Sequence, residues 1–277
     1  MAYNSNVPTP FYHLSLGEAL LDHPDLPAEA RTLLAAQRGA FLFGNTAPDV
    51  QVISGQMRQE THFFDLPLRQ VRRHPWEQML LKYPRLGNAG GLPPAQAAFI
   101  TGYLCHLQAD WLWVKEIFVP VFGLRSAWDN FPRRLYLHNV LRAYLDRQIY
   151  PGLTNGTYTH LSRVEPAGWL PFVRDEHLRQ WRGFLAEQLH PQAAVQTVEV
   201  FAARQGIAPG EFYRMIESEE QMDRLIFSRL PRTTLDEYRQ RSLDSHLELV
   251  SAFVQPRAEP SLQEVHYESN RKSRPEQ

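Results

Sequence analysis

The chain has 277 residues, of which 43% are hydrophobic and 12% aromatic, so it is long and apolar enough to bury one large core or two small ones. Its 29 lysines and arginines balance 30 aspartates and glutamates. This balance excludes the strong overall field of a protein that attracts nucleic acid or an anionic membrane with its whole surface. The single cysteine, Cys105, excludes an internal disulfide and a cysteine-rich zinc module, which leaves histidines and carboxylates as metal ligands.

We expect neither a signal peptide nor a membrane-spanning helix in this sequence. The start lacks the basic region and apolar core of a signal peptide, and no apolar stretch reaches the ~20 residues of a membrane helix. We therefore expect a soluble, cytoplasmic protein without a transmembrane segment. Segment 256–277 is polar and poor in aromatic residues, which predicts a disordered tail after a single domain over 1–255.

Apolar residues recur at spacings of three and four along most of the chain, and alternation of β-branched residues is almost absent. This periodicity predicts an all-α fold. Helices are expected at 12–22, 27–43, 94–118, 132–148, 166–189, 192–205, 209–229 and 232–254. The second helix is expected to end at Gly44, a natural C-terminal cap, and 44–93 to form a long irregular insert.

A histidine and a carboxylate lie four residues apart, at His106 and Asp110, inside the apolar run 98–111. On a helix both side chains project from one face about a turn apart, close enough to bind one cation. Three further candidate ligands precede this pair along the chain: His13, Asp49 and His62. Burying such a set together without a cation or hydrogen-bond partners would be costly, so the set predicts a metal site in a cleft.

The order of these elements carries a family resemblance. A Tyr-His pair at 12–13, a Pro-Asp loop at 48–49, the sequence His-Phe-Phe-Asp at 62–65 and a helical His-x-x-x-Asp at 106–110 follow one another. The ordered set resembles the zinc-dependent phospholipase C family over roughly residues 9–148. That family has an all-helical fold, shared with single-strand-type nucleases, so the resemblance implies the same fold here.

The resemblance also implies a role for each ligand. Asp49, His62, His106 and Asp110 would bind one zinc ion, and Asp110 would bridge to a second zinc ion that is also held by His13. A water shared by the two ions would attack phosphorus, and the leaving group would depart as an alcohol. In the family, the residue that matches Asp49 has been considered as a base for this water.

The sequence departs from the family pattern in two places. Secreted members use their processed N-terminal residue as a ligand, but no cleavage signal is seen here, so a terminus at Ala2, water or another side chain are the alternatives. In the family a third zinc ion has its own ligands. The corresponding positions of this sequence are occupied by Glu116, His138 and Arg142. Because a guanidinium does not ligate a cation, we expect the third ion to be lost.

In place of that ion, we expect Arg142 to pair with Glu116 or to face the metal cleft. There it would act as a catalytic residue that offers fixed positive charge to a substrate phosphate.

These observations predict a phospholipase C-like, metal-dependent hydrolase that acts on a small phosphoester or a phospholipid. The alternatives are a nuclease or small-molecule phosphodiesterase on the same scaffold, and a non-catalytic helical protein with a structural metal. Nucleic acid is not the first choice, because the arginine- and aromatic-containing segment 69–76 is short and lacks a recognition motif.

Overall fold

Helices form all the regular secondary structure of the described part of the chain. The computed structural model describes residues 7–65, 73–123, 130–153, 156–190, 192–193 and 196–254, and these ranges contain no strand. The predicted all-α fold is confirmed. In the same ranges, no helix has both the length and the apolar character needed to cross a bilayer. The tail predicted at 256–277 and the terminal ligand considered at Ala2 lie outside the described residues.

The first half of the chain is arranged around one long helix, α7. The elements before it are α1 (Pro10–Leu21), α2 (Ala28–Ala36), α3 (Arg38–Gly44), the 3-10 helix η1 (Ala47–Val50), α4 (Gln51–Ser54), α5 (Arg58–His62), α6 (Pro75–Lys82), and the 3-10 helices η2 (Pro84–Gly87) and η3 (Ala89–Gly91). Helix α7 (Pro94–Trp113) continues directly into a π-helical segment, η4 (Val114–Phe122).

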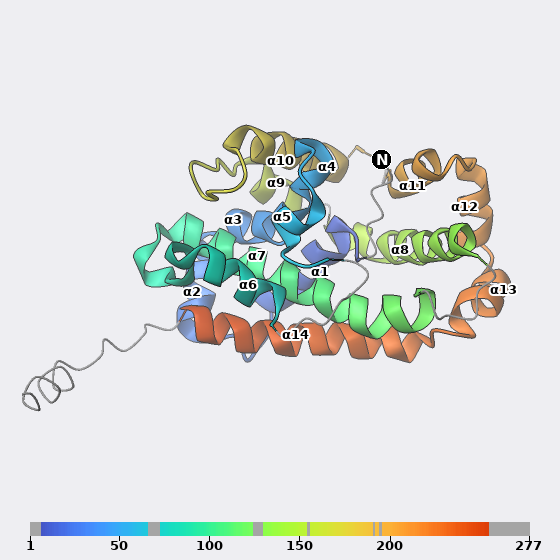
Figure 1. The fold of residues 1–277 in the computed structure, drawn as a ribbon, viewed down its shortest axis with the longest axis horizontal. Coiled ribbons are helices and arrows are strands. Elements are labelled where there is room, and N and C mark those ends of the chain that lie inside the picture. Colours follow the sequence, from blue (N-terminus) through green and yellow to red (C-terminus); the bar gives the residue numbers. More distant parts are fainter. Residues whose placement is uncertain are drawn as a thin grey trace, which may run out of the picture.

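The second half of the chain surrounds this centre. Its elements are α8 (Phe131–Leu153), α9 (Thr157–Ser162), α10 (Asp175–Leu189), α11 (Thr197–Gln205), α12 (Pro209–Ile216), α13 (Glu219–Met222), the π-helical η5 (Asp223–Phe227) and α14 (Arg232–Val254). In Figure 1, α14 runs along the lower edge, α9 and α10 lie at the opposite edge, and α11 to α13 close one end.

Several predicted helices differ from the structure in their bounds. The one expected at 192–205 begins only at Thr197. The one expected at 27–43 breaks at Gln37, whose φ of −118° and ψ of 34° are not helical, into α2 and α3. The one expected at 166–189 begins only at Asp175, because the preceding segment contains two prolines and Gly168 with a positive φ of 67°. The one expected at 209–229 is divided into α12, α13 and η5.

The stretch 44–93 is not irregular, and Gly44 is not a helix cap. In its described residues the stretch contains η1, α4, α5, α6, η2 and η3, all of them short. Gly44 is the last residue of α3, and Asn45 is the cap. A helix of four or five residues shows too little periodicity to be found from sequence.

Helix α7 is the centre of the core. Every residue from Ala97 to Trp111 is buried, because neighbours cover the helix on all sides. From α14, the Tyr238 hydroxyl donates to the Ala109 carbonyl at 3.1 Å. From α7 itself, the Tyr103 hydroxyl donates to the Thr61 carbonyl of α5 at 2.6 Å. These bonds fix the elements that carry the predicted site residues.

Helices α3 and α7 touch backbone to backbone at two glycines. A Cβ atom added to Gly44 would lie 2.0 Å from the Phe99 carbonyl oxygen, and one added to Gly102 would lie 2.1 Å from the Phe41 carbonyl oxygen. No side chain fits at either position. The close approach brings the end of α3 to the level of His106, one turn after Gly102 on the same face of α7.

We predict that Gly44→Ala lowers the free energy of unfolding by about 1–3 kcal/mol, because the new methyl group forces α3 and α7 apart. Chemical denaturation followed by circular dichroism measures the change. Gly183→Ala is the control: Gly183 lies in α10, and an added Cβ meets nothing within 4 Å. That variant should gain roughly 0.5–1 kcal/mol from helix propensity. Equal stability of Gly44→Ala and the parent would contradict the backbone contact.

Candidate metal centre

The structure brings the five predicted site residues into one buried cluster. His13 comes from α1, Asp49 from η1, His62 from the end of α5, and His106 and Asp110 from α7. All five are buried. Residues that span almost a hundred positions of the chain therefore meet at one place, as the sequence predicts.

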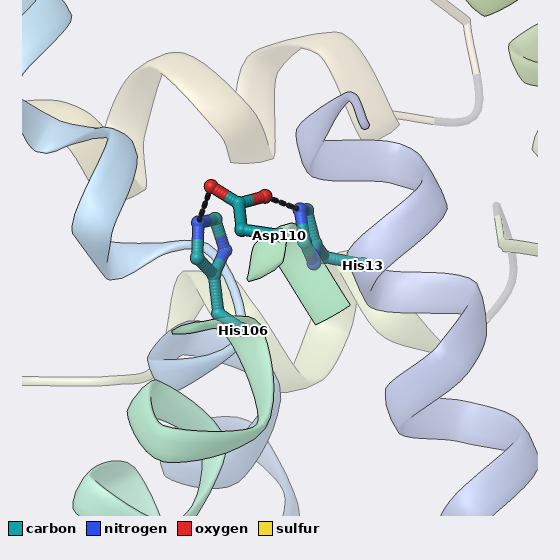
Figure 2. Close-up of side chains that lie close together, drawn as sticks. All are labelled: His13, His106 and Asp110. Carbon is teal, nitrogen blue, oxygen red and sulfur yellow. Dashed lines mark hydrogen bonds and ion pairs between the residues drawn. The ribbon is translucent and has the colours of Figure 1, made fainter. Parts of the chain in front are cut away.

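Asp110 occupies the middle of the cluster. Its Oδ1 lies 3.1 Å from His13 Nε2, and its Oδ2 lies 3.4 Å from His62 Nε2 and 3.6 Å from His106 Nε2. Figure 2 shows the carboxylate between His13 and His106, with one oxygen turned towards each imidazole. The rings of His13 and His106 stack with their centroids 3.8 Å apart. One carboxylate thus faces three imidazoles.

Among the residues that the structure describes, two overlapping sets of three side chains are close enough to hold a metal ion. One consists of His13, His106 and Asp110, and the other of Asp49, His62 and His106; within each set the ligand atoms lie within 4.8 Å of one another. His62 Nε2 is 3.4 Å from both Asp49 Oδ1 and His106 Nε2. Imidazole nitrogen and carboxylate oxygen are donors that suit zinc, so the set fits this ion. The role of each ligand stays a prediction.

Hydrogen bonds on the outer side of two imidazoles orient them. His106 Nδ1 lies 2.8 Å from the carbonyl oxygen of Asn45, the cap of α3, and the last carbonyls of a helix have no partner within it. His62 Nδ1 lies 2.9 Å from Thr61 Oγ1. When Nδ1 carries the proton and donates it outward, Nε2 presents its lone pair to the cluster.

Arg58 is a sixth member of the cluster that the sequence analysis missed. One guanidinium nitrogen donates to Asp110 Oδ2 at 2.7 Å, and the group lies over the Phe64 ring at 4.4 Å. Arg58 and His62 are four residues apart in α5, so they share one face. The guanidinium compensates part of the negative charge that the fold buries here.

Both carboxylates stay ionised. Burial by itself raises the pKa of Asp110, but the charge and hydrogen bonds of His106 and His13 outweigh it and hold this pKa well below the usual range. Burial likewise raises the pKa of Asp49, and the neighbouring His62 and His106 reverse the direction. Ionised carboxylates are the form that binds a cation.

The imidazoles differ in their affinity for a proton. Burial, and next the positive charge of Arg58, lower the pKa of His62 to about 4, so this ring is neutral at neutral pH and its Nε2 is free to act as a ligand. Burial lowers the pKa of His13 as well. Burial also lowers that of His106, but Asp110 more than offsets this and the pKa is raised. A metal ion therefore competes with a proton at His106.

The predicted pairing of Arg142 with Glu116 is wrong. Glu116 pairs with Arg241 of α14 at 2.9 Å. It lies in η4, where the wider π-helical turn changes the direction of the side chains that follow α7. The second expectation, that Arg142 faces the metal cleft, stays a prediction: Arg142 lines a pocket together with Asp49, which belongs to the cluster.

His138 is not placed to hold a third ion. It is buried, accepts a hydrogen bond from Trp113 Nε1 at its Nε2 over 3.1 Å, and lies against the rings of Phe118 and Phe122. Burial and the charge of Arg142 hold its pKa well below the usual value. These contacts describe a core histidine, and the loss of the third zinc site stays a prediction.

Comparison with known proteins gives one match. Residues 12–113 match a family model described as zinc dependent phospholipase C, which confirms the family resemblance over that part of the chain. The matched range contains all five predicted ligands and Arg58. No curated protein and no solved structure matches the chain.

We predict that Thr61→Val weakens zinc binding about 10- to 100-fold, because His62 loses the partner that orients its ring. A competition titration with a zinc-sensitive dye measures the affinity. Thr101→Val is the matched control: Thr101 is also buried, but its hydroxyl donates to the Ala97 carbonyl of its own helix. Equal zinc affinities for the two variants would contradict the orienting role of Thr61.

The metal-free protein should lose stability as the pH falls from about 6.5 to 4. Burial lowers the pKa of His62 to about 4 and that of His246, whose Nε2 is 2.9 Å from the Cys105 carbonyl oxygen, to about 3. The unfolded chain, where both have the usual 6.5, binds more protons in this interval, so stability falls on acidification by about 1.4 kcal/mol per pH unit for each proton. His13 and His138, whose pKa burial also lowers, add to this fall. Asp146, whose pKa burial raises to about 7, and His106, whose pKa is raised, act against it without reversing its sign.

Urea unfolding with chelator at pH 6.5, 5.5 and 4.5 tests this dependence. His246→Gln should reduce the slope, because one of the buried histidines with a lowered pKa is then absent. Constant stability over the interval would contradict the buried, neutral state of both histidines.

Proposed function

We propose that this chain, whose residues 12–113 carry the zinc-dependent phospholipase C family match, is a zinc-dependent hydrolase of phosphoesters. The observation that supports the proposal best is the convergence of three imidazoles and two ionised carboxylates on one buried point. Asp49, His62, His106 and Asp110 would hold one zinc ion, and Asp110 with His13 would hold a second. Each carboxylate oxygen of Asp110 faces a different histidine, which suits a bridging ligand.

Bound zinc supplies an acidified water as nucleophile and a Lewis acid for the phosphoryl oxygens. Residues of the chain orient the water and stabilise the phosphoryl group. Asp49 accepts a hydrogen bond from the attacking water and thereby orients it. Because its pKa is lowered, this carboxylate is a weak base but still a good hydrogen-bond acceptor. Water adds to phosphorus, and the ester oxygen leaves as an alcohol. Arg142 contributes fixed positive charge towards the phosphoryl group from the pocket that it shares with Asp49.

A catalytic role is favoured over a structural metal by the position of Asp49. A structural zinc site is closed by protein ligands, whereas a catalytic site keeps one position open. Asp49 belongs to the cluster and also lines a pocket, so the cluster is accessible from one side. A phospholipid or a smaller phosphoester is the substrate that we propose.

Zinc analysis and an assay panel test the proposal. Protein purified without added zinc should contain zinc, and it should hydrolyse phosphodiesters or phosphomonoesters in a reaction that a chelator abolishes and zinc restores. Unchanged hydrolysis after verified removal of the metal would contradict a metal-dependent mechanism. Bound zinc without hydrolysis of any phosphoester would favour the structural alternative.

We predict that Asp110→Asn weakens zinc binding more than about 100-fold and abolishes hydrolysis, because an amide replaces neither the charge nor the second acceptor oxygen. Circular dichroism checks the fold, since Asp110 also binds His13 and Arg58. His177→Ala, a partly exposed position of α10, is the control and should keep both properties. Equal hydrolysis rates for Asp110→Asn and the parent would remove the bridging role.

A further inference from the structure

The pocket beside Asp49 has an apolar wall and an apolar rim. On α10, the rings of Trp181 and Phe184 stack with centroids 5.5 Å apart, and the Trp181 Nε1 donates to the Thr46 carbonyl at 2.8 Å, which fixes the indole. Phe184 and Val52 are 36% and 37% exposed at the edge of the same pocket. Exposed apolar side chains gathered at a pocket mark a site for an apolar ligand group.

Two guanidinium groups line the same pocket. Arg142 of α8 is buried, donates to Asn139 Oδ1 at 3.0 Å and lies over the Phe201 ring at 4.5 Å, so its position is fixed. Arg204 of α11 lines the pocket and is exposed. Asp49, at the metal cluster, attracts both charges. The pocket therefore combines an apolar wall with two positively charged guanidinium groups.

The buried carboxyl group of Asp146 offsets the charge of Arg142 only in part. The buried Asp146 attracts Arg142, and its two carboxylate oxygens accept hydrogen bonds from Thr9 and from Thr197, the latter at 2.6 Å. Burial raises the pKa of Asp146 to about 7, so it is only partly ionised at neutral pH. Arg142 keeps its charge, because burial lowers its pKa only to about 10.

We propose that this pocket binds an anionic group next to an apolar chain or ring, and that Arg142 and Arg204 select substrates whose non-reacting part is negatively charged. The preferred substrates are then anionic amphiphilic phosphoesters, and those with a cationic headgroup are disfavoured. Like charges brought together in a partly desolvated pocket cost free energy, whereas a guanidinium and an anion form strong hydrogen bonds. The claim about substrates rests on the proposed function, but the claim about binding does not.

The test uses octyl sulfate as the probe, because it combines an anionic group with an apolar chain and contains no phosphoester. Isothermal titration of the zinc-loaded protein, below the micelle concentration, should show binding of octyl sulfate and much weaker binding of octyltrimethylammonium. Arg204→Gln and Arg142→Gln should each weaken octyl sulfate binding about tenfold. Phe184→Ser should weaken it by removing part of the apolar rim.

Arg147→Gln is the matched control. Arg147 lies on α8 like Arg142, but it is exposed and faces Glu217 at 3.4 Å, so this variant should bind octyl sulfate as the parent does. Zinc content and melting temperature are measured for every variant. Arg204 is exposed, so its variant keeps the test valid if Arg142→Gln fails to fold.

Two results would overturn the inference: equal binding of the anionic and cationic probes, or octyl sulfate binding by Arg204→Gln equal to that of the parent. Charge-selective binding in a protein that hydrolyses no phosphoester would support the inference while contradicting the proposed function. The two claims therefore fail separately.

Discussion

The burial of two ionised carboxylates at the centre of a helical protein is the constraint on which the rest of this structure depends. Moving an isolated carboxylate out of water costs several kcal/mol even after relaxation, unless cations or hydrogen-bond donors surround it. Around Asp110 the fold places His13 at one carboxylate oxygen, and His62, His106 and the guanidinium of Arg58 at the other. The same groups that make the burial tolerable are those that would hold a metal ion.

The backbone contact between α3 and α7 links the fold to the site. Gly102, His106 and Asp110 follow one another at intervals of four on one face of α7. The glycine lets α3 approach, the approach brings the Asn45 carbonyl to His106, and this carbonyl turns the ring so that Nε2 faces Asp110. Packing thus determines which nitrogen of His106 is available to the cluster.

The parts of the site that depend on local spacing could be predicted from the sequence. The pair His106 and Asp110 follows from helical periodicity alone, and the ordered positions of His13, Asp49 and His62 follow from the family resemblance. The parts that depend on tertiary contacts could not. Gly44 is predicted to be a helix cap, because the sequence around it does not show that the backbone of α7 contacts this glycine.

Two other differences between sequence and structure have physical causes. Arg58 lies in a helix of five residues, too short for a periodic pattern, although its spacing of four from His62 was a usable signal. The expected partner of Arg142 was wrong because the π-helical turns of η4 direct Glu116 towards Arg241. The prediction treats 94–118 as one α-helix, whereas the turns of η4 are π-helical and therefore wider.

Anomalous diffraction at the zinc edge, from crystals of the zinc-loaded protein, tests the central claim most directly. The account predicts a peak about 2.0–2.2 Å from the Nε2 atoms of His62 and His106 and from an oxygen of Asp49, with Asp110 completing the set. A protein that binds zinc only elsewhere, with these side chains still joined directly to one another, would contradict it.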